Sequence, residues 1–301
     1  MISKFPHLTL LELSDMEDVH AITSHYEPYS DFDFISMYSW NTEGKLAIAE
    51  LNDNLVLKFH DYVTGEPFYT FIGTNLPVET VETLLVHSVR EGLKPVLNMI
   101  PECVTTLLPT DLFISTEQPE HADYIVSVPL LASLDVPELA NKRRAINKFK
   151  RATNNFRFEQ VDLDDFTQRE KIIDLFDRWK DIKTENYNEH ERQALSRCIA
   201  GHFHSSLVAT GAYVEDQLEA FWIIGDLENT YGISHFEKAD TETFDGIFPF
   251  LKQETARLLK DRGIEHINLE QDLGIMGLRK SKLSYFPQSL LLKYAVSHTN
   301  A

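Results

Sequence analysis

The sequence predicts an α/β protein with two tandem lobes, each a mixed, mostly antiparallel sheet flanked by helices. The chain has 301 residues, which is enough for one large or two ordinary domains. Short alternating apolar segments typical of strands are interspersed with segments that carry an apolar face at helical spacing. The element order of the first half returns in the second half, although the residues themselves show no convincing repeat. We therefore expect a first lobe over residues 1–134 and a second over 135–301.

In the first lobe, helices are expected where an N-cap residue or a proline precedes an apolar face. Ser14 and Glu17 have the spacing of a capping box, and Ser30 can cap the helix that follows it. These signals place helices over residues 14–25, 31–40, 78–91 and 101–108. Strands are expected where apolar residues run or alternate between turn residues, over 8–11, 46–51, 55–59, 68–72, 96–100, 113–116 and 124–128.

The second lobe is expected to open with an inter-lobe helix over residues 138–152. Thr167 and Glu170 form another capping-box pattern, which should begin a helix. Later helices are expected over 189–203 and 246–260, and strands over 156–161, 207–214, 218–224 and 231–236. The chain should close with a strand at 264–269, a short helix and a strand at 290–296.

Composition limits the possible functions. The formal net charge is −19, which argues against broad binding to nucleic acid or to anionic membranes, so any phosphate contact must use a local basic patch. The two cysteines, Cys103 and Cys198, have no partners at metal-binding spacing, and the histidines are scattered, so no metal site is expected. No signal peptide and no apolar run of membrane-spanning length is present, which favours a cytoplasmic protein.

The closing stretch, residues 263–296, contains the strongest candidate for a catalytic site. Its first strand ends on Glu270 and Asp272, and Arg279 and Lys282 follow one helical turn later at a spacing of three. Open α/β folds bind ligands at the carboxyl ends of strands. A carboxylate there can accept a proton from a nucleophile, and a cation can stabilise an oxyanion. The alternative is an ion-pair cluster that only holds the loop.

A second candidate is the basic run over residues 141–151, which has six cations and no acid in a strongly acidic chain. One interpretation is a solvated helix face whose cations favour the helix C-terminus. The other is a contact with phosphates or an RNA backbone. The candidate binding residues in this run are Lys142, Arg143, Arg144, Asn147 and Lys148.

A third candidate lies in the strand that begins at Tyr231. His235 and Glu237 alternate there with apolar residues, so part of this strand should face the cleft. Histidine is the usual proton shuttle near neutral pH. A single histidine on a strand is more often a hydrogen-bonded structural residue, and both interpretations stay open. Tyr231, His235 and Glu237 are candidate substrate-binding residues.

The run from Asn268 to Pro287, NLEQDLGIMGLRKSKLSYFP, resembles the closing motif of the phosphatidylglycerol lysyltransferase C-terminal domain family. Lys142, Arg143, Asn147 and Phe149 are similar to a second element of that family, K-R-x-x-x-N-x-F. The resemblance implies two tandem lobes of the GNAT acyltransferase fold. It also implies relatedness to enzymes that move amino acids from charged tRNA onto lipids or peptidoglycan precursors.

The resemblance makes a transferase of aminoacyl or acyl groups the leading function, with its active site in the cleft of the second lobe. Glu270 or Asp272 would orient or deprotonate the acceptor, Arg279 and Lys282 would steady the carbonyl or a phosphate, and the basic run would hold the donor. The acceptor could be a small molecule, a lipid or a peptide.

Coenzyme A is less favoured than aminoacyl-tRNA as the donor, and no permanently bound cofactor is expected. Neither lobe has the glycine-rich loop that cradles a pyrophosphate, and residues 239–246 contain three acids. Two alternatives remain: a non-catalytic binding protein that keeps the fold, and an acyltransferase that uses coenzyme A in an atypical way.

Overall fold

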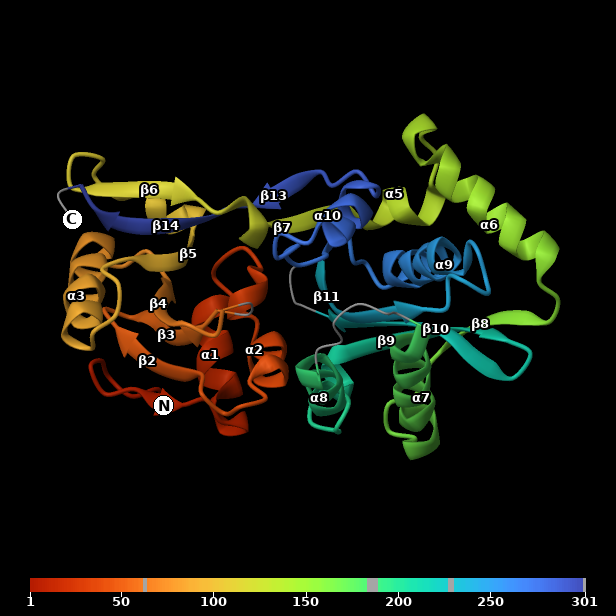
Figure 1. Cartoon of the computed structure of the whole chain (residues 1–301), viewed down its shortest axis with the longest axis horizontal. Coiled ribbons are helices and arrows are strands. Elements are labelled where there is room, and N and C mark those ends of the chain that lie inside the picture. The colour runs from red at the N-terminus through yellow and green to blue at the C-terminus, as the bar shows by residue number, and fades with distance from the viewer. Residues whose placement is uncertain (62–63, 183–188, 227–229, 300–301) are drawn as a thin grey trace. The chain divides into compact units, whose positions relative to one another are not determined.

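The computed structural model describes residues 1–61, 64–182, 189–226 and 230–299 (Figure 1). Contacts divide the chain into two compact units, each built from segments distant in sequence. The first unit comprises Met1–Asp123, Gln271–Arg279 and Leu290–Ala301, and the second comprises Tyr124–Glu270 and Lys280–Ser289. The predicted fold class, mostly antiparallel sheets flanked by helices, is confirmed. The repeat of two lobes divided after residue 134 stays a prediction.

The first unit contains two antiparallel sheets. One has the order β1 (Thr9–Leu10), β2 (Ala47–Leu51), β3 (Asn54–His60) and β4 (Pro67–Ile72). The other has the order β5 (Leu97–Pro101), β14 (Lys293–His298) and β6 (Phe113–Glu117). Its helices are α1 (Met16–Thr23), α2 (Phe34–Trp40), α3 (Pro77–Arg90) and α4 (Glu102–Thr105).

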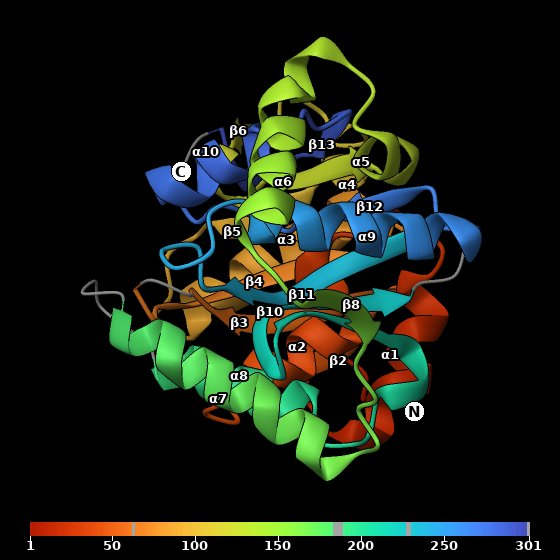
Figure 2. The same cartoon turned by 90° about the vertical axis from the view of Figure 1, so that its right-hand side faces the viewer.

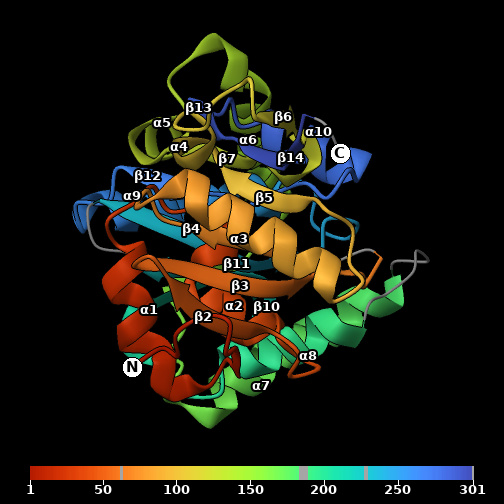
Figure 3. The same cartoon turned by 90° about the vertical axis from the view of Figure 1, so that its left-hand side faces the viewer.

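A stripe of apolar side chains on α3 packs into the core of the first unit. Val81, Leu84 and Leu85 on α3 are buried and pack with residues of β3, β4 and β5. Figure 3 shows α3 lying across these strands. Burial of apolar surface stabilises a fold by about 25 cal/mol per Å². Burial of this stripe therefore stabilises the helix that the apolar spacing predicted.

The second unit has a seven-stranded sheet. Its order is β13 (Ser289–Leu291), β7 (Asp123–Ser127), β12 (His266–Asn268), β11 (Tyr231–Ala239), β10 (Gln217–Asp226), β9 (Leu207–Val214) and β8 (Phe156–Gln160). Strands β11 and β12 run parallel, and α9 (Ile247–Asp261) connects them. A helical crossover of this kind is what a parallel pair requires.

Helices cover both faces of this sheet (Figure 2). Helices α5 (Val128–Ser133), α6 (Ala140–Ala152) and α9 lie on one face, and α7 (Phe166–Ile182) and α8 (Glu189–Cys198) lie on the other. The short helix α10 (Met276–Leu283) follows β12 along the chain. In the part of the chain that the structure describes, no helix combines the length and the apolarity needed to cross a membrane.

The structure corrects four details of the sequence prediction. Thr167 does not cap α7, because the helix begins at Phe166 and Asp165 accepts the Thr167 amide at 2.7 Å. The capping box near residue 14 is formed by Glu12 and Asp15, and Ser14 takes no part in it. Ser30 does not cap α2, because Asp33 accepts the Ser36 amide and begins the helix. At both helix starts a nearby aspartate, Asp15 or Asp33, accepts the backbone amide, so the hydroxyl of Ser14 or Ser30 is not needed as the acceptor.

The expected single strand at 290–296 is two strands. Strand β13 joins the sheet of the second unit, whereas β14 joins β5 and β6 in the first. The chain therefore changes sheets at Leu292, which apolar patterning alone does not reveal.

Candidate functional site

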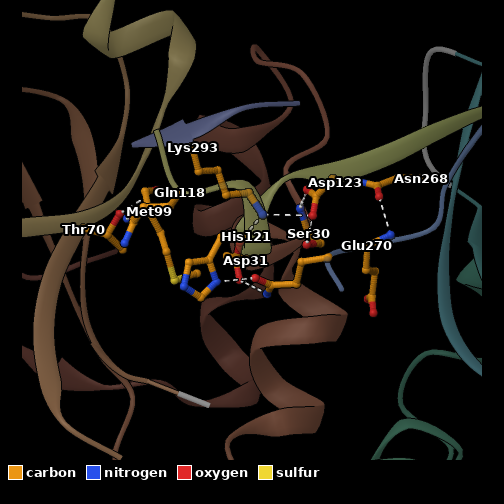
Figure 4. A network of polar contacts seen from close by, with 11 residues as sticks. Ser30, Asp31, Thr70, Met99, Gln118, His121, Asp123, Asn268, Glu270 and Lys293 are labelled. Atoms are coloured by element: carbon orange, nitrogen blue, oxygen red, sulfur yellow. Dashed lines mark hydrogen bonds and ion pairs between the residues drawn. The ribbon is translucent and has the colours of Figure 1, made fainter. Parts of the chain in front are cut away.

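Glu270 is held at the end of β12 by a buried amide. The Oδ1 atom of Asn268, whose side chain is buried, accepts the backbone N–H of Glu270 at 2.6 Å (Figure 4). Glu270 has a φ of +60°, a left-handed conformation that non-glycine residues adopt at an energetic cost. Its side chain keeps one fifth of its surface exposed. Glu270 thus presents a partly accessible carboxylate just after the carboxyl end of β12, and it does so in a strained backbone conformation.

His235 lies near Glu270, at a β-bulge in β11. Phe236 pairs with Ile223 and Ser234 pairs with Ile224, so His235 is the extra residue of the bulge. Its ring lies over Gly225, where an added Cβ would collide with Nε2. The His235 Nδ1 lies 3.9 Å from Oε1 of Glu270. The structure therefore brings together two residues that the sequence assigned to different candidates.

Tyr231 does not belong to this pair. It lies at the start of β11, and its ring packs against His266 with the centroids 4.8 Å apart. Lys282 lies in the last turn of α10 within the second unit and is half-buried.

Asp272 and Arg279 form an ion pair within the first unit, with the Asp272 side chain buried and the Arg279 side chain partly exposed. Arg279 donates from Nε to Oδ2 of Asp272 at 2.8 Å and from a terminal nitrogen to Oδ1 at 3.0 Å. The amide of Gly274 donates to the same Oδ1 at 2.7 Å, and the Asp272 side chain has no exposed surface. Both carboxylate oxygens of Asp272 thus have partners within the loop, as the alternative of an ion-pair cluster that only holds the loop requires. A catalytic role for the pair stays a prediction.

Helix α6 has two different polar faces. On one, Arg144, Asn147, Lys148 and Arg151 line a shallow surface depression together with Ala152. Of the predicted binding residues on this helix, Lys148 pairs with Asp245 at 2.7 Å, and Arg144 donates to Asn141.

Arg143 donates its hydrogen bonds to backbone carbonyl groups. It donates to the carbonyl oxygens of Leu134 and Val136, the second at 2.8 Å. The guanidinium therefore fixes the turn that precedes α6, which is a structural use of one of the predicted phosphate ligands.

The inner face of α6 contributes to a cluster of charged and aromatic residues that we call the Lys142–Lys252 cluster. Its members are Lys142, Trp222, Glu237, Phe248, Lys252, Ser284 and Tyr285. Lys142 donates to Oγ of Ser284 at 2.7 Å, and its Nζ lies 4.0 Å from the ring centroid of Tyr285. Burial, followed by the nearby charge of Lys252, lowers the pKa of Lys142 to about 8.

Lys252 is the buried member of this cluster. It is 2% exposed, lies 5.0 Å from the Tyr285 ring and 4.2 Å from that of Trp222, and pairs with Glu237 at 2.6 Å. Neither Lys252 nor Tyr285 was predicted from the sequence to be a site residue. Lys252 lies four residues after Phe248 on the apolar face of α9, and a lysine at such a position was the available signal.

The first unit contains a second buried network, also missed from the sequence (Figure 4). Lys293 on β14 pairs with Asp31 and, at 2.9 Å, with Asp123, and none of the three side chains is exposed. Ser30 donates its amide and its hydroxyl to Asp123, and Gln271 donates to Asp31. Burial alone would lower the pKa of Lys293, but the two carboxylates outweigh it and raise the pKa.

Comparison with known proteins gives the following similarities. A family model described as "Phosphatidylglycerol lysyltransferase, C-terminal" matches residues 25–297. A comparison with curated proteins gives no match. A conserved protein of unknown function from Bacteroides thetaiotaomicron VPI-5482 has 26% identity and a TM-score of 0.83, with 99% of this chain and 100% of that chain covered.

Two further solved structures share the fold. L-PGS from Bacillus licheniformis has 14% identity and a TM-score of 0.63, with 100% of this chain and 95% of that chain covered. FemX has 7% identity and a TM-score of 0.57, with 98% of each chain covered. At these identities the likeness extends to the fold alone.

Proposed function

We propose that this chain, which belongs to the phosphatidylglycerol lysyltransferase C-terminal family, transfers an aminoacyl or acyl group to an acceptor, with aminoacyl-tRNA as the donor. The observation that carries the proposal is the family match, which extends over residues 25–297 of the 301-residue chain. The acceptor is of a class that provides an amine or a hydroxyl group, as a lipid headgroup, a peptide or a small molecule does.

The reaction requires a group that takes a proton. The acceptor's nitrogen or oxygen attacks the carbonyl carbon of the donor ester, a new bond forms, and the ester C–O bond breaks. The acceptor's proton passes to a base and then to the departing hydroxyl oxygen of the donor. We assign the base to Glu270, because its carboxylate is partly exposed and lies at the end of β12.

His235 would assist Glu270. The Nδ1 atom of His235 lies 3.9 Å from Oε1 of Glu270, close enough to influence the position of the carboxylate. Asp272, the other predicted base, is engaged by Arg279 and Gly274 and is assigned to holding the loop. Arg279 and Lys282 remain predicted partners of the carbonyl oxygen.

The donor's phosphates would lie along the exposed face of α6. Arg144, Lys148 and Arg151 are exposed there in a chain of net charge −19, which makes this face a local reversal of charge. Phosphate contacts of this kind fix the register of an RNA and weaken as salt increases. The proposal thus uses a different part of the basic run from Lys142 and Arg143, which have structural contacts of their own.

Acyl-coenzyme A fits the second unit less well as a donor. The position at which related folds bind a pyrophosphate is the N-terminus of the helix corresponding to α9. Gly246 caps this helix, and an added Cβ there would collide with the carbonyl oxygen of Ala145 on α6. The amides of Glu242 and Thr243 just before α9 already donate to Asp240.

The deciding experiment measures binding of charged tRNA, uncharged tRNA and acetyl-coenzyme A at two salt concentrations. The triple variant R144E/K148E/R151E is compared with K45E/R90E/K94E, which changes the net charge equally at exposed sites of the first unit. We expect only the α6 variant to lose charged-tRNA binding. Equal losses in both variants would mean non-specific attraction, acetyl-coenzyme A binding would overturn the donor, and no binding at all would favour a non-catalytic protein.

A further inference from the structure

We propose that Ser284 and Lys142 form a serine–lysine dyad that hydrolyses carboxylic esters through an acyl-serine intermediate. The Nζ atom of Lys142 lies 2.7 Å from Oγ of Ser284, the separation at which an amine base and a hydroxyl nucleophile share a proton. Both residues belong to the second unit and are half-buried, so the pair keeps access to solvent. Hydrolysis of an ester needs neither tRNA nor an acceptor, so this activity goes beyond the proposed transfer and does not depend on it.

The end of α10 holds Ser284 in place. Its backbone N–H donates to the carbonyl oxygens of Lys280 and Ser281, both at 3.1 Å. Its hydroxyl donates to the carbonyl of Ser281 at 2.6 Å while it accepts from Lys142. A serine hydroxyl has one proton and two lone pairs, so it can turn and donate to Lys142 once that amine has lost its proton. Rotation of the hydroxyl alone thus prepares the nucleophile.

Lys142 has the surroundings of a base. No carboxylate in the described part of the chain pairs with it, and burial, followed by the charge of Lys252, lowers its pKa to about 8. A lysine beside another cation in a partly desolvated place is the kind that reacts as a neutral amine. The ring of Tyr285 orients it, with the centroid 4.0 Å from Nζ. The amine is therefore both held in place and available in its neutral form near physiological pH.

Tyr285 adds a hydrogen-bond donor beside the dyad. The residue follows Ser284 directly and is 3% exposed, and its hydroxyl has no hydrogen-bond partner among the residues that the structure describes. Burial, followed by the carboxylate of Glu237, raises the pKa of Tyr285, so the hydroxyl keeps its proton at neutral pH. Buried hydroxyl groups nearly always have a partner, and a donor left without one is of the type that stabilises an oxyanion.

The reaction has two steps. Oγ of Ser284 attacks the ester carbonyl carbon, its proton passes to Lys142, and the bond to the alcohol oxygen breaks as Lys142 returns the proton to that oxygen. Water then attacks the acyl-serine, gives a proton to Lys142, and releases a carboxylic acid as the proton returns to Ser284. The dyad carries one proton, and an alcohol leaves with less help from an acid than an amine does. Esters are therefore the substrate class.

The test combines a covalent probe with a substrate. An alkyl fluorophosphonate reacts with an activated serine by losing fluoride, and peptide mapping by mass spectrometry identifies the labelled residue. Methylumbelliferyl acetate, a simple ester, reports hydrolysis by fluorescence. The variants are S284A and K142R, and the matched controls are S289A, at an exposed serine of the same unit, and K150R, at an exposed lysine of the same helix. Circular dichroism verifies that each variant is folded.

We expect the probe to label Ser284, and S284A to lose both the label and the hydrolysis. K142R should reduce both rates by about 100-fold or more, because a guanidinium keeps the charge and the hydrogen bond but stays protonated and cannot act as a base. S289A and K150R should keep the wild-type rates. An unlabelled wild type, a label on another residue, hydrolysis that persists in S284A, or equal losses in K142R and K150R would overturn the proposal.

The pH dependence of labelling tests the base separately from the fold. The charged and titratable groups around Lys142 are Lys252 of α9, which pairs with Glu237 of β11, and Tyr285. The labelling rate of the wild type should increase as the pH rises through about 8, because Lys142 then loses its proton. In K142R the increase should disappear. A rate in the wild type that does not change between pH 6.5 and pH 9.5 would show that Lys142 is not the base.

Discussion

Each of the two units buries a lysine, and the environments of the two lysines differ. In the first unit Lys293 lies with two carboxylates, and its pKa is raised. In the second unit Lys252 has one carboxylate and a second lysine nearby, and the pKa of that second lysine, Lys142, is lowered. The lysine of the first unit therefore has more negative than positive charge around it, whereas the lysine pair of the second unit shares a single carboxylate.

The difference separates a lysine that pairs with two carboxylates of the chain from a lysine that pairs with no carboxylate among the described residues. Asp123 accepts three hydrogen bonds, from Lys293 and from the amide and hydroxyl of Ser30. That network is satisfied by the chain itself. Around Lys142 the chain provides one hydroxyl and one ring face, with no carboxylate among the described residues.

The largest expected effect is on the first network. Lys293→Met should reduce the free energy of unfolding by about 3–5 kcal/mol, because two buried carboxylates lose their counter-ion. Urea unfolding monitored by circular dichroism measures the change, with the exposed Lys94→Met as control. A loss under about 1 kcal/mol would contradict the structural role and would remove the contrast between the two lysines.

The next effect tests whether Glu270 acts in chemistry. Glu270→Gln should reduce turnover by about 100-fold or more, because the amide cannot accept the acceptor's proton. The free energy of unfolding should change by less than about 0.5 kcal/mol, as for other partly exposed positions. Turnover is measured with the donor identified by the binding experiment. Unchanged turnover would remove Glu270 from the mechanism.

Asp272→Asn tests whether Asp272, unlike Glu270, has only a structural role. The substitution leaves Arg279 with a neutral acceptor, and we expect a loss of about 2 kcal/mol in the free energy of unfolding. If the pair only holds the loop, substrate affinity and turnover per folded molecule should fall far less than in Glu270→Gln. A fall in turnover as large as that of Glu270→Gln, without loss of stability, would instead support the predicted catalytic role.

The sequence predicted the element types well, because helical and strand periodicities depend on local spacing. The apolar face of α3 and the run at β9–β10 are examples in which local pattern and burial agree. It also placed His235 and Glu237 on one strand, but the bulge at His235 depends on pairing with β10 and is not visible in β11 alone.

The networks could not be predicted, since their partners are far apart along the chain. Lys293 lies 262 residues from Asp31 and 170 from Asp123, and no local spacing encodes those contacts. Glu270 and Asp272 are only two residues apart, yet they belong to different units. Where the partner is distant in sequence, the only local signal is an unexpected residue type, such as a lysine within an apolar stripe.

The smallest expected effect concerns pH. The pKa of Lys142 is about 8 in the folded protein and near 10.5 in the unfolded chain, so the unfolded state binds more protons between these values. Stability contributed at this residue should therefore increase as the pH rises through 8 towards 10. Because the side chain is only half-buried, solvent screening reduces the gain to about 1 kcal/mol. The measurement is the difference between wild type and K142M in urea unfolding at pH 7 and pH 9.5. A difference that stays constant would show that Lys142 is hydrated like a surface lysine, and its contrast with Lys293 would then rest on the first unit alone.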